Sequence, residues 1–166
     1  HTRKSRRMIP MLYHNVLTEP EEYLKTVKAG SFEDIETEAG LFKGVQIKGT
    51  DALCSLVSRF MPDYEVVMNF VRKSPLGQEE PNFIHSDDMH GDKTAIYYLN
   101  KNYPSGYGTT IYDNNNVPVL INMAQFNSLF IFDSIYKHSR NIEENFGQEE
   151  NARMVQVMFL KKISEV

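Results

Sequence analysis

Three side chains that can bind a metal ion are spaced along the sequence so that strands would bring them together. His85 and Asp87 stand two positions apart in the segment FIHSD, residues 83–87. Because side chains at i and i+2 of a β-strand point to the same face, this pair can direct an imidazole and a carboxylate to one point. His138 stands on another predicted strand, fifty-one residues after Asp87. It completes a set of two histidines and one carboxylate.

This ligand set suits iron(II), because it occupies one face of the ion and leaves positions open for a co-substrate and dioxygen. A closed structural zinc site would need a fourth protein ligand, and Cys54 is the only cysteine. His90 is the competitor for a ligand position, although its neighbours are typical of a turn. We therefore predict an iron site at His85, Asp87 and His138.

A cationic side chain, Arg153, begins a strongly apolar predicted strand. Alternation along residues 153–159 places its guanidinium on the same face as the two valines and the phenylalanine of that segment. A guanidinium on an apolar face is costly unless an anion pairs with it, ideally a carboxylate held by two hydrogen bonds. A dicarboxylate such as 2-oxoglutarate can chelate iron at one end and pair with Arg153 at the other. Arg140, two residues after His138 on the same face, is the alternative anchor.

The elements that would position these side chains are mainly short strands. The predicted strands are 65–71, 82–86, 94–100, 109–113, 117–122, 128–133, 136–141 and 153–161, rich in β-branched and aromatic residues. Gly, Pro, Asn and Asp separate them. Eight short strands behind one or two helices favour a β-sandwich or barrel over alternating βαβ units.

The first sixty residues have a mixed pattern. Residues 8–13 predict an edge strand, because a proline is tolerated there. A helix is predicted to begin near Thr18 and to end near Gly30, and a second helix to span 50–61. Residues 31–42 are acidic and aperiodic, which favours a loop.

Composition indicates a globular protein of ordinary domain size. The chain has 166 residues, of which 41% are hydrophobic and 24% charged. A formal net charge of −4 argues against a nucleic-acid partner, and the basic cluster at 3–7 is interpreted as a solvated arm. No apolar run is long enough to span a membrane. With a single cysteine, a cytoplasmic location is predicted.

Five segments in the second half of the chain carry a family resemblance. They are HSDDMHGDKTAIYYLNK (85–101), GYGTTIYD (106–113), SLFIFDS (128–134), KHS (137–139) and RMVQVMFL (153–160). Over residues 64–162, their order resembles the iron(II)- and 2-oxoglutarate-dependent oxygenases, most closely the prolyl-4-hydroxylase-like branch. The resemblance implies a mainly β, double-stranded β-helix (jelly-roll) fold. One or two N-terminal helices would pack on one sheet, and the metal would lie at one open end.

The resemblance also implies roles for individual residues. His85, Asp87 and His138 match the metal triad, Arg153 matches the residue that anchors 2-oxoglutarate, and Tyr98 matches a tyrosine that supports this co-substrate. The implied reaction uses Fe(II), 2-oxoglutarate and O2 to hydroxylate an unactivated C–H bond, with release of succinate and CO2. It needs no catalytic side chain beyond the metal ligands. A peptide substrate, with a peptidyl proline, is favoured over a small molecule.

Three departures from the branch leave the substrate open. Arg153 follows His138 by fifteen residues, so residues 143–151 would form an enlarged turn. Phe70 stands where a tyrosine is common, and Gly106-Tyr107-Gly108 replaces a Gly-Gly pair. Loops at 31–40, 74–81 and 101–107 are predicted to shape the substrate pocket, and no residue is assigned to it.

We predict a single oxygenase domain over residues 1–166, with an N-terminal strand and helices at 8–62 and a jelly-roll core at 63–162. Two alternatives remain at this stage. One is a cupin-type metal enzyme that does not use 2-oxoglutarate, and the other is a non-catalytic β-sandwich that binds a partner. The sequence does not indicate an oligomeric state.

Overall fold

The computed structural model describes residues 8–47, 51–80, 82–141 and 144–164. The first elements are β1 (Met11–Tyr13), α1 (Pro20–Ala29), β2 (Glu33–Thr37), β3 (Gly40–Gln46) and α2 (Asp51–Phe60). They are followed by β4 (Tyr64–Ser74), β5 (Lys93–Tyr98), β6 (Gly108–Tyr112), β7 (Pro118–Met123), β8 (Ser128–Asp133), β9 (Lys137–Arg140) and β10 (Arg153–Lys162). A short 3-10 helix, η1 (Glu149–Asn151), precedes β10.

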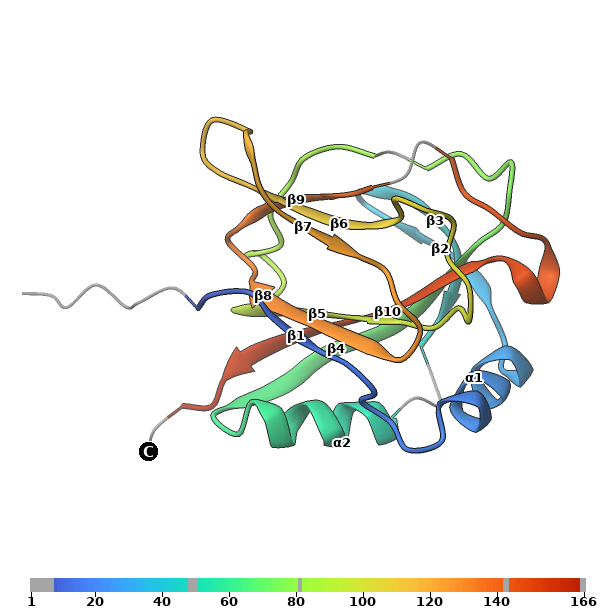
Figure 1. Ribbon diagram of the computed structural model, residues 1–166, viewed down its shortest axis with the longest axis horizontal. Helices are drawn as coiled ribbons and strands as arrows, with labels where there is room; N and C mark the ends of the chain where they lie inside the picture. Colours follow the sequence, from blue (N-terminus) through green and yellow to red (C-terminus); the bar gives the residue numbers. More distant parts are fainter. Residues whose placement is uncertain (1–7, 48–50, 81, 142–143, 165–166) are drawn as a thin grey trace, which may run out of the picture.

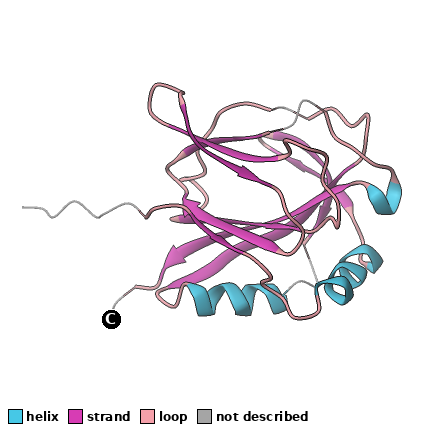
Figure 2. Cartoon of the chain, viewed as in Figure 1, coloured by secondary structure: helices cyan, strands magenta, loops and turns pink. Residues whose placement is uncertain are grey.

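Two antiparallel sheets face each other. The larger sheet has the order β1-β8-β5-β10-β4-β3-β2, and the smaller has the order β7-β6-β9. Figure 1 shows the smaller sheet stacked over the larger one, and Figure 2 shows both α-helices below the larger sheet. This is the mainly β jelly roll with helices on one sheet that the resemblance implied, and that prediction is confirmed.

The helices cover the outer face of the larger sheet. Leu24 and Val27 of α1 and Leu53 and Val57 of α2 are buried in one cluster with Tyr97 and other outward side chains of the strands. The second helix predicted from the sequence is therefore confirmed as α2, and its apolar side chains meet the sheet. No helix in the described part of the chain is long and apolar enough to cross a membrane.

The space between the sheets holds a second apolar cluster. Tyr98, Phe130, Phe132 and Val155 enter it from the larger sheet and Ile111 from the smaller one. Residues 129–132 of β8 are all apolar because both faces of the strand are buried, one beneath the helices and one between the sheets. Arg153 stands two positions before Val155 on β10, so its side chain points to the same face, between the sheets.

Two predictions for local structure were wrong. Residues 31–42 are not a loop, since β2 and β3 pair as an antiparallel hairpin at the sheet edge. The hairpin is exposed on both faces along much of its length, so no apolar period marks it. Residues 82–86 are not a full strand, because His85 alone pairs with the smaller sheet, through an isolated antiparallel bridge to His138.

The packing of α2 gives a test of stability. Leu53 is fully buried, whereas Leu41 in the edge hairpin is 55% exposed. We expect Leu53→Ala to lower the free energy of unfolding by about 2–5 kcal/mol, because it removes buried methyl groups and leaves a cavity. The matched Leu41→Ala should change it by less than about 0.5 kcal/mol. Urea unfolding followed by circular dichroism measures both, and equal effects would contradict this packing.

Candidate metal centre

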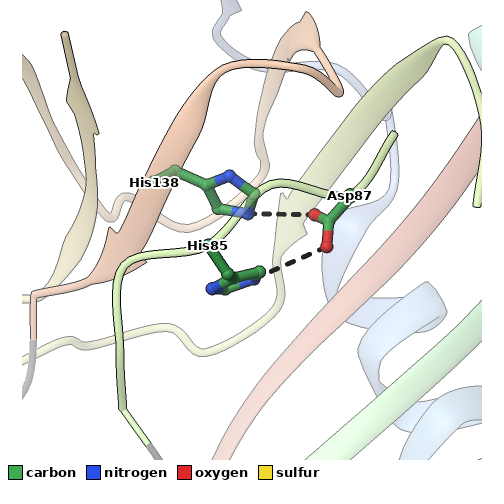
Figure 3. Close-up of side chains that lie close together, drawn as sticks. All are labelled: His85, Asp87 and His138. Atoms are coloured by element: carbon green, nitrogen blue, oxygen red, sulfur yellow. Dashed lines mark ion pairs between the residues drawn. The ribbon is translucent and has the colours of Figure 1, made fainter. Parts of the chain in front are cut away.

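The three predicted metal ligands lie together at the margin of the smaller sheet. His138 Nε2 lies 2.9 Å from Asp87 Oδ2, and His85 Nε2 lies 3.5 Å from Asp87 Oδ1. One ligand atom of each residue lies within 4.8 Å of those of the other two. Figure 3 shows the two imidazole rings and the carboxylate directed toward one another. Among the described residues this is the one such group of three His, Cys, Asp or Glu side chains.

The backbone explains why residues so far apart in sequence meet here. The amides and carbonyls of His85 and His138 exchange two hydrogen bonds, of 3.0 and 2.8 Å. The amide of Asp87 donates to the carbonyl of Ser134 at 2.8 Å, which ties the segment to the end of β8. Both ends of the ligand segment are therefore held by main-chain bonds rather than by the ligands themselves.

Both histidines present Nε2 to the centre because their Nδ1 atoms are engaged elsewhere. Nδ1 of His85 lies 2.9 Å from the carbonyl oxygen of Phe83, and Nδ1 of His138 lies 3.0 Å from that of Tyr136. A carbonyl oxygen can only accept, so each Nδ1 carries a proton and donates it. A metal ion would displace the proton from Nε2, whose lone pair would then bind the ion, as in other histidine ligands whose Nδ1 is held by a carbonyl oxygen.

Asp87 is suited to bind a cation. Burial raises the pKa of its carboxyl, but the hydrogen bond and charge of His138, with the nearby His85 and His90, hold that pKa below its ordinary value of 3.8. The carboxylate is therefore ionised at neutral pH. A donor set of two imidazoles and one carboxylate fits iron(II).

The alternative ligand, His90, lies outside the group. Its side chain is exposed and stacks on Phe159, with ring centroids 4.9 Å apart. His14 is also exposed, whereas His1 and the basic segment 3–7 lie outside the described residues.

Arg153 is buried between the sheets at the start of β10. It is only 7% exposed, and burial followed by the charge of Arg140 lowers the pKa of its guanidinium. No Asp or Glu among the described residues forms an ion pair with it. A buried guanidinium without an anionic partner is costly. The structure thus provides a buried cation on the inner face of the sandwich.

Tyr98 lies on the same inner face, at the end of β5. Its Oη lies 2.8 Å from Thr109 Oγ1, and Asn122 Nδ2 donates to it at 3.3 Å. Burial raises the pKa of Tyr98, despite the opposing effects of these bonds and of Arg153. The hydroxyl therefore remains protonated at neutral pH, where it can donate a hydrogen bond.

Arg140, the alternative anchor, is engaged with a carboxylate. Its Nη1 lies 2.8 Å from Oε2 of Glu80, and its Nη2 donates to the Glu80 carbonyl at 3.4 Å. Glu80 also pairs with Arg72 at 3.2 Å. Arg140 therefore has a carboxylate partner, whereas Arg153 has none among the described residues.

The described part of the turn before β10, residues 144–152, contacts two neighbouring loops. Phe146 packs edge-on against Tyr103 and Tyr107, and its carbonyl accepts a 2.9 Å hydrogen bond from the Arg153 amide. Asn145 donates to the Gln78 carbonyl at 2.8 Å, so the turn is also tied to the 74–80 loop. Asn145 and Phe146 therefore anchor the described part of this turn to neighbouring loops.

Known structures share this fold. A prolyl hydroxylase from Trichoplax adhaerens, solved with a peptide fragment of the hypoxia inducible factor oxygen degradation domain, is 17% identical with a TM-score of 0.65. That likeness covers 91% of this chain and 82% of the hydroxylase. A Pseudomonas putida prolyl-4-hydroxylase is 14% identical, with a TM-score of 0.59 and 93% of each chain covered.

A third likeness is to a non-haem alpha-ketoglutarate-dependent epimerase from nogalamycin biosynthesis. It is 11% identical, with a TM-score of 0.60, and the likeness covers 90% of this chain and 76% of the epimerase. Comparison with protein-family models and with curated protein sequences gives no match. At these identities the likenesses establish the fold.

Sequence reasoning missed Glu80 and the partners of Tyr98. Thr109 and Asn122 are directly paired across β6 and β7, so parity on these strands could have placed both on the inner face. Glu80 lies in an aperiodic loop, and its partner Arg140 is sixty residues away. No local signal in the sequence indicates that pair.

The ligand assignment predicts the behaviour of single substitutions. We expect Asp87→Ala and His138→Ala to abolish stoichiometric iron(II) binding, because two remaining ligands do not complete the facial set. His90→Ala should retain it. Anaerobic isothermal titration with iron(II) measures the binding, and loss in His90→Ala equal to that in His138→Ala would contradict the assignment.

The Glu80 contacts predict a pH dependence of stability. Burial raises the pKa of Glu80, but Ser74, Arg72, Gln78 and Arg140 together hold it below its ordinary value of 4.5. The stability from this carboxylate is therefore full above pH 4.5 and lost as pH falls through the lower folded-state value. Urea unfolding should show Glu80→Gln less stable than the parent at pH 7, with the difference shrinking below pH 4.5.

The neighbouring Glu79 provides the matched control. It is exposed, and Glu79→Gln should change the free energy of unfolding by less than about 0.5 kcal/mol. A Glu80→Gln deficit that stays constant from pH 7 to pH 3 would show that its charge does not contribute.

Proposed function

We propose that this chain is an Fe(II)- and 2-oxoglutarate-dependent dioxygenase that hydroxylates an unactivated C–H bond and releases succinate and CO2. The observation that carries the proposal is the buried Arg153, whose guanidinium has no carboxylate partner among the described residues. A group of two histidines and one aspartate that could hold a metal ion belongs to the same sandwich. One dicarboxylate that chelates a metal would satisfy both features.

We assign the binding of the metal and of the co-substrate to different residues of the chain. His85, Asp87 and His138 hold the metal, and Arg153 binds the distal carboxylate through charge-assisted hydrogen bonds. Iron(II) with 2-oxoglutarate would supply the activation of dioxygen. No side chain needs to transfer a proton as a general base.

Tyr98 is proposed as the second contact to the distal carboxylate. Its protonated hydroxyl already lies against Thr109 and Asn122, which restrict its position. It contributes to the same apolar cluster as Phe130 and Phe132, and this cluster excludes water from the inner face. Electrostatic contacts to the co-substrate are stronger in such a dry site.

We propose a peptide substrate, with a peptidyl proline preferred. Apolar side chains next to the metal ligands are exposed, including Phe83 at 61% and Met89 at 70%. The ring of Phe83 lies 5.1 Å from that of His85. Such a surface favours an uncharged group beside the metal, and the similar Trichoplax enzyme was solved with a peptide.

The remaining predictions concern the whole chain. We propose that residues 1–166 act as one oxygenase domain, because β1, β2 and β3 belong to the same sheet as β4 and β10. A cupin-type enzyme without 2-oxoglutarate has less support, since His90 is not a fourth ligand. A non-catalytic sandwich would leave the buried Arg153 unexplained. The cytoplasmic location stays a prediction.

The deciding experiment adds iron(II) and 2-oxoglutarate to the purified protein without oxygen. We expect a visible charge-transfer band that is absent in Asp87→Ala. In Arg153→Gln the band should require at least about tenfold more 2-oxoglutarate, since hydrogen bonds to charged groups contribute roughly 1.5–3 kcal/mol. The exposed Arg59, changed to Gln, is the control and should leave the titration unchanged.

A protein that binds iron(II) stoichiometrically and gives no band would contradict the use of 2-oxoglutarate. The cupin-type alternative would then account better for the metal group. Release of succinate with a proline-containing peptide, measured in air, tests the substrate separately.

A further inference from the structure

Two guanidinium groups, those of Arg72 and Arg140, pair with one carboxylate in the neighbourhood of Arg153. The carboxylate belongs to Glu80, whose side chain is only 5% exposed. Its oxygens pair with Arg140 and Arg72 and accept 2.6 Å hydrogen bonds from Ser74 Oγ and Gln78 Nε2. Glu80 is therefore fully engaged with groups of the chain itself.

This network adjoins the co-substrate anchor. Ser74, which donates to Glu80, is the direct cross-strand partner of Arg153. Arg140 is the cross-strand partner of Thr109, which contacts the Tyr98 hydroxyl. Arg140 and Glu80 both lie close enough to Arg153 to affect its guanidinium, with opposite signs. Without Glu80, two cations would compete for one anionic ligand.

We propose that Glu80 is a positioning residue that makes Arg153 the sole anchor of the co-substrate carboxylate by holding Arg140 and Arg72 away from it. This inference rests on the proposed function. A guanidinium pairs with whichever carboxylate is within reach, and Glu80 provides that carboxylate permanently for Arg140. Arg153 is then the guanidinium that pairs with the carboxylate of the co-substrate, which binds and leaves.

The same contacts hold the chain that leads to the metal. Glu80 precedes His85 by five residues, and Asn82 Nδ2 donates to the Arg140 carbonyl at 3.3 Å. The Glu80–Arg140 pair thus fastens this segment to β9 just before the His85–His138 bridge. Truncation of Glu80 would disturb both sites, so the isosteric Glu80→Gln is the informative change.

The test asks whether a second substitution, at Glu80, restores the 2-oxoglutarate binding that Arg153→Gln loses. Replacing Glu80 by Gln removes the carboxylate charge that competes with a bound dicarboxylate for Arg140. We expect Arg153→Gln to weaken 2-oxoglutarate binding at least about tenfold, and Glu80→Gln/Arg153→Gln to recover at least about threefold of that loss. Adding Arg140→Gln should abolish the recovery. Glu79→Gln/Arg153→Gln is the matched control and should show none.

Two titrations measure these affinities. The first adds 2-oxoglutarate to the anaerobic iron(II) protein, and the second adds glutarate to the metal-free protein, so that one readout is independent of the metal. Far-UV circular dichroism checks the folding of each variant. A merely structural role of Glu80 would lower affinity further in the double variant and could not restore it.

A second measurement does not depend on the folding of the Glu80 variant. With Glu80 intact, Arg140→Gln should change 2-oxoglutarate affinity less than about threefold, because Arg140 does not contact the co-substrate. A loss as large as that of Arg153→Gln, or a double variant no better than Arg153→Gln alone, would overturn the role of Glu80. Absence of 2-oxoglutarate binding by the unsubstituted protein would instead contradict the proposed function, and this inference with it.

Discussion

Two backbone hydrogen bonds between His85 and His138 are the constraint on which the candidate site depends. They join a segment with no other strand pairing to the margin of the smaller sheet. Since the bonds belong to the main chain, the imidazoles remain free to turn their Nε2 atoms inward, and the Nδ1 contacts to nearby carbonyls maintain that orientation. Metal binding would therefore use a geometry that is largely formed beforehand.

Two charged groups of opposite sign are buried in this fold. One is the Asp87 carboxylate beside two imidazoles, and the other is the Arg153 guanidinium near Tyr98 and Tyr103. Each arrangement is unfavourable when isolated, because a buried charge loses hydration that only a partner can replace. A metal ion at the carboxylate and an anionic ligand at the guanidinium would satisfy both.

The sequence predicted most of the large sheet because β5, β8 and β10 carry apolar residues on buried faces. It also predicted that His85, Asp87 and His138 would lie together, as they do in the structure. The roles of Arg153 and Tyr98 stay predictions. It failed for the β2–β3 hairpin, whose exposed faces leave no hydrophobic period. It favoured Arg153 over Arg140 as the anchor without excluding Arg140, because Glu80, the partner of Arg140, lies in an aperiodic loop and meets it only in the folded chain. The choice of anchor stays a prediction.

The position of β10 has a consequence for how the protein is made. This last strand lies between β4 and β5, at the centre of the larger sheet, and pairs with both over most of its length. A ribosome must therefore deliver the chain as far as Lys162 before β4 and β5 acquire their shared neighbour. Until then their inner edges stay open to other chains, so folding is expected to be slow and most vulnerable to aggregation during synthesis.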